Sequence, residues 1–117
     1  MPSPLCHFEI MTADPERAKE FYGKVFGWEF DDQSMPGYTL ISTGAEPTGG
    51  MFKKPDEASG VCLNAYFLVA NVAQSLQKAI ELGAKPLVEP TSIPNVGEFA
   101  IIADPDGIAV GLFKPVE

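Results

Sequence analysis

The sequence predicts an α+β protein built from two copies of one βαβββ unit, and two observations support this prediction. Residues 6–11 alternate in the manner of a strand and lead into Asp14-Pro15, a helix-start signal. The same order returns at residues 61–69, which lead into Asn71 as a second helix cap. One such unit leaves a sheet face and a helix stripe uncovered, so two copies are expected to pair.

In the first copy, Asp14 is expected to cap the helix, with Pro15 at its first position. Gly27 stands where a left-handed residue usually ends a helix. The expected apolar stripe consists of Ala18, Phe21, Tyr22, Val25 and Phe26. Strands are expected at 28–30, 38–43 and 49–52.

In the second copy, Asn71 caps a helix, Gln74 forms a capping-box-like pair with it, and Gly83 ends it. The expected stripe consists of Val72, Leu76, Ala79 and Ile80. Strands are expected at 85–88, 99–103 and 108–113, with a tight turn at 104–107. The chain is thus predicted to be one domain (1–117), with module one at about 5–53, a connector at 54–60 and module two at about 61–115.

Length and charge exclude several classes of protein. A chain of 117 residues with 45% hydrophobic and 21% charged residues has room for one globular domain. A net charge of -8 repels phosphate backbones and anionic membranes, so neither nucleic acid nor membrane is an expected partner. No signal-peptide or membrane-spanning pattern is present, and a cytoplasmic location is expected.

Two segments resemble a known superfamily. Residues 8–28, which end in Gly27-Trp28, resemble the opening of vicinal oxygen chelate proteins, and Ala103-Asp-Pro-Asp-Gly107 resembles their closing motif. This superfamily includes glyoxalase I, extradiol dioxygenases, and bleomycin or fosfomycin resistance proteins. Residues 49–52 and 93–97 are similar to a glyoxalase-like subgroup without an assigned reaction. The resemblance implies a sheet that curls around a cleft, helices on the outer face, and a homodimer.

Enzymes of this superfamily bind a divalent metal through four positions, one on the first and one on the last strand of each module. His7 matches the first position, whereas residues 49–52 offer no carboxylate for the second. Asn64 and Gly111 stand where His and Glu are usual. A single ligand does not hold a cation. No cofactor is therefore expected, and a metal remains an alternative only if a dimer completes the site.

His7 and Glu9 are the candidate catalytic residues, because alternate strand residues share a face. They form either an acid–base or substrate-anchoring pair, or they pair with each other or lie at a solvated edge. Gly49, Gly50 and Gly111 are expected to leave open backbone that a ligand can approach. The remaining candidates for ligand contact are Asn64, Tyr66, Met51, Phe52, Phe99 and Phe113, of which the apolar ones are equally compatible with plain core.

Two functions fit these observations. The first is a metal-independent protein that binds a neutral or cationic small molecule in the cleft. The second is a glyoxalase-type lyase or isomerase, or a dioxygenase-related enzyme, in which Glu9 and His7 transfer protons. Fold does not decide between them.

Overall fold

The computed structural model describes residues 2–56, 60 and 62–116. The chain forms two compact units: the first unit is His7–Leu63, and the second unit combines Met1–Cys6 with Asn64–Glu117. Residues before His7 therefore group with the second half of the chain. Residues 57–59 of the predicted connector and the expected strand start at Val61 lie outside the described residues.

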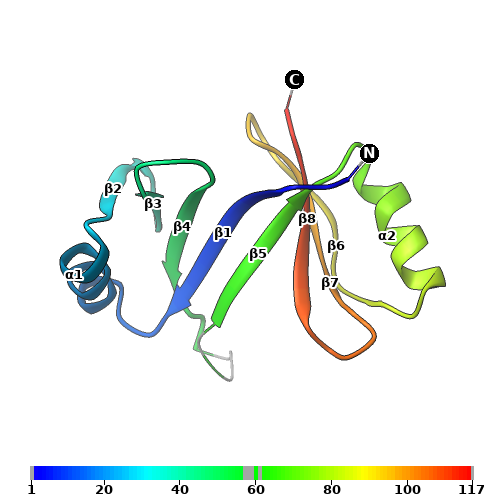
Figure 1. Cartoon of the computed structure of the whole chain (residues 1–117), viewed down its shortest axis with the longest axis horizontal. Helices are drawn as coiled ribbons and strands as arrows, with labels where there is room; N and C mark the ends of the chain where they lie inside the picture. The colour runs from blue at the N-terminus through cyan, green and yellow to red at the C-terminus, as the bar shows by residue number, and fades with distance from the viewer. Residues whose placement is uncertain (1, 57–59, 61, 117) are drawn as a thin grey trace. The chain divides into compact units, whose positions relative to one another are not determined.

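The first unit holds a helix and four strands in the order β2-β3-β4-β1, with β1 parallel to β4 and the other neighbours antiparallel. These elements are β1 (Leu5–Thr12), α1 (Pro15–Phe26), β2 (Glu29–Met35), β3 (Tyr38–Ser42) and β4 (Thr48–Lys53). Figure 1 shows α1 at the far end of this unit, connected to β1 and β2.

The second unit repeats this topology in the order β6-β7-β8-β5, with β5 parallel to β8. Its elements are β5 (Cys62–Leu68), α2 (Val72–Glu81), β6 (Lys85–Ile93), β7 (Gly97–Ala103) and β8 (Ala109–Pro115). Equivalent positions pair in both units, since Glu9 lies opposite Gly50 and Tyr66 lies opposite Gly111. The predicted α+β class and the repeated βαβββ unit are confirmed.

Both helix caps form as predicted. The amide of Arg17 donates to Asp14 Oδ1 at 3.2 Å, and the amide of Gln74 donates to Asn71 Oδ1 at 2.9 Å. Gly27 ends α1 with a left-handed φ of 72°. Helix α2 ends one residue earlier than predicted, with Leu82 as its C-cap.

Two strands end five residues beyond their predicted ends. Strand β2 continues to Met35, and β6 continues to Ile93 through two register shifts. Pro86 and Pro90 of β6 lack an amide proton and cannot donate a hydrogen bond to a neighbouring strand. The pairing of β6 with β7 tolerates both prolines because β6 is an edge strand of its unit.

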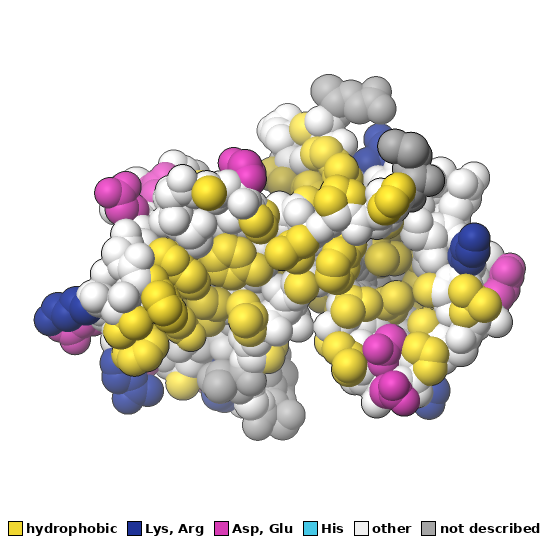
Figure 2. Space-filling model, viewed as in Figure 1, with side chains coloured by type: hydrophobic (Ala, Val, Ile, Leu, Met, Phe, Trp, Pro, Cys, Tyr) yellow, Lys and Arg dark blue, Asp and Glu magenta, His cyan; other side chains and the backbone are white. Residues whose placement is uncertain are grey.

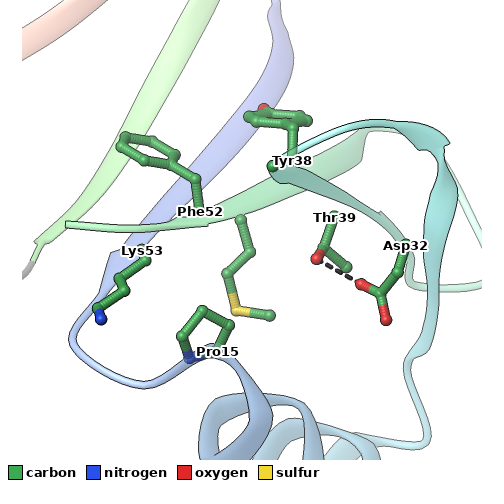
Figure 3. A pocket seen from close by; sticks show the side chains of 8 residues that line it. Pro15, Asp32, Tyr38, Thr39, Phe52 and Lys53 are labelled. Carbon is green, nitrogen blue, oxygen red and sulfur yellow. Dashed lines mark hydrogen bonds between the residues drawn. The ribbon is translucent and has the colours of Figure 1, made fainter. Parts of the chain in front are cut away.

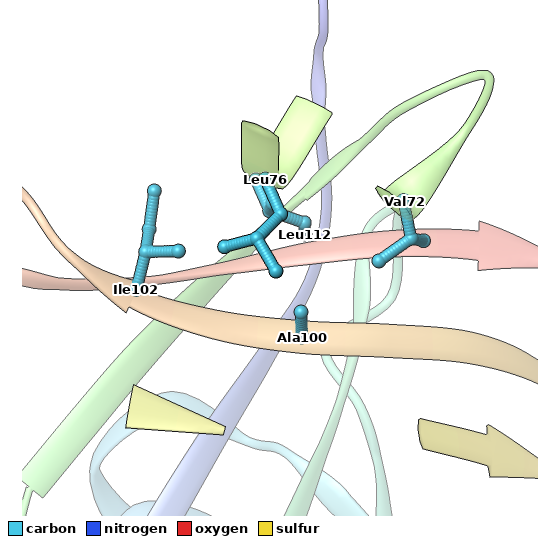
Figure 4. Packing of buried hydrophobic residues seen from close by; sticks show 5 residues of the cluster. All are labelled: Val72, Leu76, Ala100, Ile102 and Leu112. Atoms are coloured by element: carbon cyan, nitrogen blue, oxygen red, sulfur yellow. The ribbon is translucent and has the colours of Figure 1, made fainter. Parts of the chain in front are cut away.

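Each unit has its own core on the side of its helix. In the second unit, α2 packs on the sheet through five buried side chains, shown in Figure 4: Val72, Leu76, Ala100, Ile102 and Leu112. In the first unit, Ile10, Ile41 and Met51 form the buried cluster, and Ala18 and Tyr22 of α1 pack against it. None of the helices in the described residues is long and apolar enough to cross a membrane.

The predicted apolar stripe of α1 is only partly buried. Ala18 and Tyr22 face the core, whereas Phe21, Val25 and Phe26 are 56%, 55% and 59% exposed. Figure 2 shows hydrophobic side chains at the surface in the part of the molecule where α1 lies. The stripe is wider than the sheet area it covers, so its outer edge remains in solvent.

Candidate functional site

A chain of hydrogen bonds crosses the face of the first unit that points away from α1. The Tyr38 hydroxyl donates to Glu9 Oε2 at 2.8 Å and lies 2.9 Å from His7 Nε2. Tyr38 has one hydroxyl proton, so both contacts are satisfied when Nε2 of His7 carries a proton and donates it to the Tyr38 oxygen. His7 and Glu9 thus lie on one face as predicted, and Tyr38 bridges them.

The Tyr38 ring fits over Gly50 because glycine has no side chain. A Cβ atom at position 50 would lie 1.8 Å from the Tyr38 hydroxyl oxygen, well inside contact distance. Gly49 is covered in the same way by the Phe8 ring, on the helix side of the sheet. The expectation of open backbone at these glycines is therefore wrong, because aromatic rings of the chain itself fill the space.

A cavity of about 380 Å³ opens beside His7. It lies within the first unit and is bordered by side chains of β1, β2, β3 and β4. Phe30, Leu40 and Ile41 give the border an apolar surface. The polar side chains on it are those of His7, Glu29, Asp31, Ser42 and Thr48. Such a volume falls in the lower part of the range of about 300–1,000 Å³ that is usual for small-molecule sites.

Burial controls the charge of His7. Desolvation lowers the pKa of the imidazole below its ordinary value, and this outweighs the raising effects of the Glu9 carboxylate and of a hydrogen bond with the Thr48 backbone. The pKa of Asp31 is also lowered, first by the Ser34 hydroxyl and then by the Gln33 amide. At neutral pH the cavity therefore presents a neutral imidazole beside an ionised carboxylate.

The candidates in the second unit gather on the face opposite α2. The buried Tyr66 ring lies over Gly111, where a Cβ atom would come within 2.2 Å of the ring. Phe99 packs edge-on against Tyr66 with ring centroids 6.4 Å apart, and it pairs with Phe113 across β7 and β8. Asn64 shares the Tyr66 face by strand alternation. Gly111 is thus also closed rather than open.

The two remaining candidates, Met51 and Phe52, are neighbours on β4 and lie on opposite faces of the sheet. Met51 is fully buried in the core below α1. Phe52 lies on the Tyr38 side, where the two rings stack 6.2 Å apart at an angle of 20°. Both border a second, smaller cavity of the first unit.

The donor set does not fit a metal of the type that the superfamily binds. Among residues 2–56, 60 and 62–116, no group of three or more His, Cys, Asp or Glu side chains is arranged to hold a metal ion. Tyr38 fills the space at Gly50, and Tyr66 fills the space at Gly111, so a carboxylate at either position requires a ring to move.

The sequence interpretation missed Tyr38, Glu29 and Asp31. The available signal was the alternation of Tyr38, Leu40 and Ser42 within the strand predicted at 38–43, which places all three on one face. The contact of Tyr38 with His7 and Glu9 depends on the pairing of β3 with β4, which cannot be predicted from alternation alone.

Sequence comparisons connect the chain to named proteins. Residues 5–44 match the family model "Bleomycin resistance protein-like N-terminal". The chain is 29% identical over 113 residues to CFP32 of Mycobacterium bovis and of Mycobacterium tuberculosis, a protein provisionally named a glyoxylase. That match covers 91% of the chain but only 43% of CFP32, so the chain spans less than half the length of these relatives.

Solved structures share the fold at low sequence identity. Methylmalonyl-CoA epimerase from Mycobacterium tuberculosis superimposes with a TM-score of 0.73 and 17% identity, covering 97% of this chain and 88% of that one. A hypothetical protein from Bacillus halodurans gives 0.74 at 15% identity, with coverages of 100% and 97%. A variant of homoprotocatechuate 2,3-dioxygenase from B. fuscum gives 0.72 at 18%, covering 99% of this chain and 34% of that one.

Proposed function

We propose that the chain, which is similar to glyoxalase-like and bleomycin-resistance-like proteins, belongs to the vicinal oxygen chelate superfamily and binds an organic small molecule without the superfamily's metal centre. The observation that carries this proposal is the position of His7. Its side chain borders a cavity of about 380 Å³ and is held from behind by Tyr38. A fixed polar group on a largely apolar wall orients a ligand.

The charges around the cavity favour a neutral or cationic ligand. Glu29 and Asp31 border it from β2, and Glu9 lies behind Tyr38. The neutral imidazole of His7 adds no positive charge to balance them. An anionic ligand is repelled at short range, and the net charge of -8 adds to this repulsion at low salt.

A thermal-shift screen of neutral and cationic compounds tests this proposal. A ligand at 100 times its dissociation constant adds about 2.7 kcal/mol of stability. The shift produced by a hit should fall in His7→Ala and persist in Gln77→Ala, an exposed control on α2. A hit whose shift is the same in wild type, His7→Ala and Glu9→Gln contradicts the placement of the site.

The second candidate function is a lyase or isomerase reaction next to a carbonyl group. It is favoured by the Tyr38 hydroxyl, which lies within hydrogen-bond distance of both His7 and Glu9 and links two groups that exchange protons. The Glu9 carboxylate would accept the proton on the carbon beside the carbonyl, and the carboxylic acid so formed would return that proton to the adjacent carbon of the enediol intermediate, which completes an isomerisation.

Deuterium exchange distinguishes the two functions. α-Hydroxycarbonyl compounds, hemithioacetals and acyl thioesters are incubated with the protein in deuterated water, and proton NMR follows the hydrogen beside the carbonyl. An enzyme exchanges this hydrogen faster than buffer does, and Glu9→Gln abolishes the difference. Exchange at the buffer rate for all three classes rules against this reaction and leaves the binding function.

A further inference from the structure

A second cavity of the first unit lies where the pairing of β3 and β4 ends. We propose that it binds a small elongated zwitterion, an amino carboxylate with its ammonium and carboxylate groups at opposite ends. This site is separate from the His7 cavity, and it is bordered by Pro15 at the start of α1 as well as by both strands.

The shape of this cavity limits its occupant to a small molecule with an apolar middle. Its volume is about 230 Å³, below the range of about 300–1,000 Å³ typical of ligand sites. Thr39 of β3 and Met51 of β4 form the last pair of these two strands and border the cavity. The residues that follow this pair, Tyr38 on β3 and Phe52 and Lys53 on β4, border the cavity as well. Pro15, Met51 and the stacked rings of Tyr38 and Phe52 provide apolar walls.

Opposite charges stand at the two ends of the cavity. Figure 3 shows Asp32 on one side and Lys53 on the other, with Pro15 between them. Thr39 donates to Asp32 Oδ1 at 2.6 Å, and Lys19 donates to Asp32 Oδ2 at 2.5 Å. These bonds fix the carboxylate and lower its pKa, with Lys19 the larger cause, so Asp32 stays ionised at neutral pH.

The local charges balance, which favours a ligand that carries both signs. Lys19 bridges Asp32 and Glu16, so two carboxylates stand against the ammonium groups of Lys19 and Lys53. A ligand with one charge gains one contact and leaves the opposite group in water. The wider negative charge of the chain is screened beyond about 8 Å at physiological salt, so the nearest groups decide.

The test compares 6-aminohexanoate with hexanoate and hexylamine, which share its chain and carry one charge each. Calorimetry or amide NMR titration gives the three dissociation constants. We expect 6-aminohexanoate to bind about fivefold more tightly than either analogue, because an exposed ion pair contributes up to about 1 kcal/mol. Lys53→Met should reduce its affinity to that of hexylamine, while Lys85→Met, in the second unit, should leave it unchanged.

Three results overturn the proposal. One is equal affinity for the three compounds, and another is the absence of binding by 6-aminohexanoate. The third is binding that is lost in His7→Ala but kept in Lys53→Met, which would place the ligand in the other cavity. A failed screen at the His7 cavity does not affect this proposal, since the two cavities are probed by different variants.

Discussion

At the scale of single residues, each unit places a tyrosine ring over the glycine of its last strand. Tyr38 on β3 covers Gly50 on the antiparallel strand β4, whereas Tyr66 on β5 covers Gly111 on the parallel strand β8. The first ring ends in a hydroxyl that bonds His7 and Glu9, and the second is buried. The same absence of a side chain thus serves a polar network in one unit and apolar packing in the other.

Alanine at these glycines is expected to displace the rings. Gly50→Ala should reduce the free energy of unfolding by about 1–2 kcal/mol, because the tip of Tyr38 moves and loses its bonds. Gly111→Ala should reduce the free energy of unfolding by more, up to about 3 kcal/mol, because the added methyl group clashes with ring carbons of the buried Tyr66. Gly60→Ala, which meets open space, is the control, and urea denaturation measures all three. Equal effects at the three positions contradict this explanation.

Removing the bridging oxygen tests the hydrogen-bond chain. Tyr38→Phe should lower the free energy of unfolding by about 1–2 kcal/mol and shift the imidazole NMR signals of His7, the only histidine in the sequence. Tyr22→Phe is the matched control, because its ring packs in the aromatic cluster with Trp28. Imidazole signals that do not change in Tyr38→Phe show that the bridge is absent in solution.

The lowered pKa of His7 predicts how stability depends on pH. The unfolded chain binds a proton below about pH 6.5, whereas folded His7 resists protonation until lower pH. The free energy of unfolding should therefore fall as the pH decreases from 7 towards 5, and this slope should be reduced in His7→Gln. Asp31 and Asp32 have lowered pKa values too, but they act below pH 3.8 and leave this window clear. Denaturation at pH 5, 6, 7 and 8 gives the slope.

Residue-level prediction succeeded where strand alternation was enough and failed where it needed pairing between strands. Alternation placed His7 and Glu9 on one face. It did not reveal that Tyr38, 29 residues from Glu9, would close the space above Gly50. A glycine appears open in a sequence because the residue that fills its space belongs to another strand.

At the scale of elements, the two helices differ in how fully they are buried. Helix α2 buries Val72 and Leu76, whereas α1 has no buried residue and leaves three large apolar side chains in solvent. Helix α1 therefore depends more on its own ends, where Asp14 and Gly27 cap it. The sequence predicted both caps correctly because capping is a local interaction.

The two N-caps give a prediction of their own. Asp14→Ala and Asn71→Ala should each cost about 1 kcal/mol, because each removes the acceptor for an amide in the first turn. Glu20→Ala, in the middle of α1, removes only an exposed ion pair with Lys24 and should cost about 0.5 kcal/mol or less. Thermal unfolding followed by circular dichroism checks the three values. A loss in Glu20→Ala as large as in Asp14→Ala contradicts the role of the cap.

Two properties of the elements could not be predicted from the sequence: how much of a helix's apolar stripe is buried, and how long a strand is. A helical stripe can be read from spacing, but how much of it the sheet covers depends on the packed structure, as Phe21 and Phe26 show. Strand β6 was predicted to end at Val88, whereas it continues to Ile93, because an edge strand accommodates Pro90.

At the scale of the whole molecule, the fold could be predicted because it is repeated. Two weak patterns with equal spacing reinforce each other, and both units adopt the same strand order. The ligand could not be predicted, because it depends on a few side chains that line cavities, and relatives with this fold carry different names.

Metal binding is tested on the intact protein. Calorimetric titration with Ni²⁺, Zn²⁺ and Mn²⁺ should show no stoichiometric binding, because only His7 occupies a position that the superfamily uses for ligands. His7→Ala provides the baseline for weak surface binding. Stoichiometric binding that is lost in His7→Ala would overturn the metal-independent function and favour a site completed by a second copy of the chain.

The tyrosine above Gly50 also limits how a carboxylate could arise at this position by mutation. Some glycine codons become glutamate codons through one base change. A side chain at position 50 would clash with the Tyr38 oxygen, so this substitution is expected to be harmful while the tyrosine is present. Loss of the tyrosine alone is also expected to be harmful, since it removes the bond that links His7 and Glu9. Each change is therefore unfavourable without the other, and the two positions are expected to show epistasis.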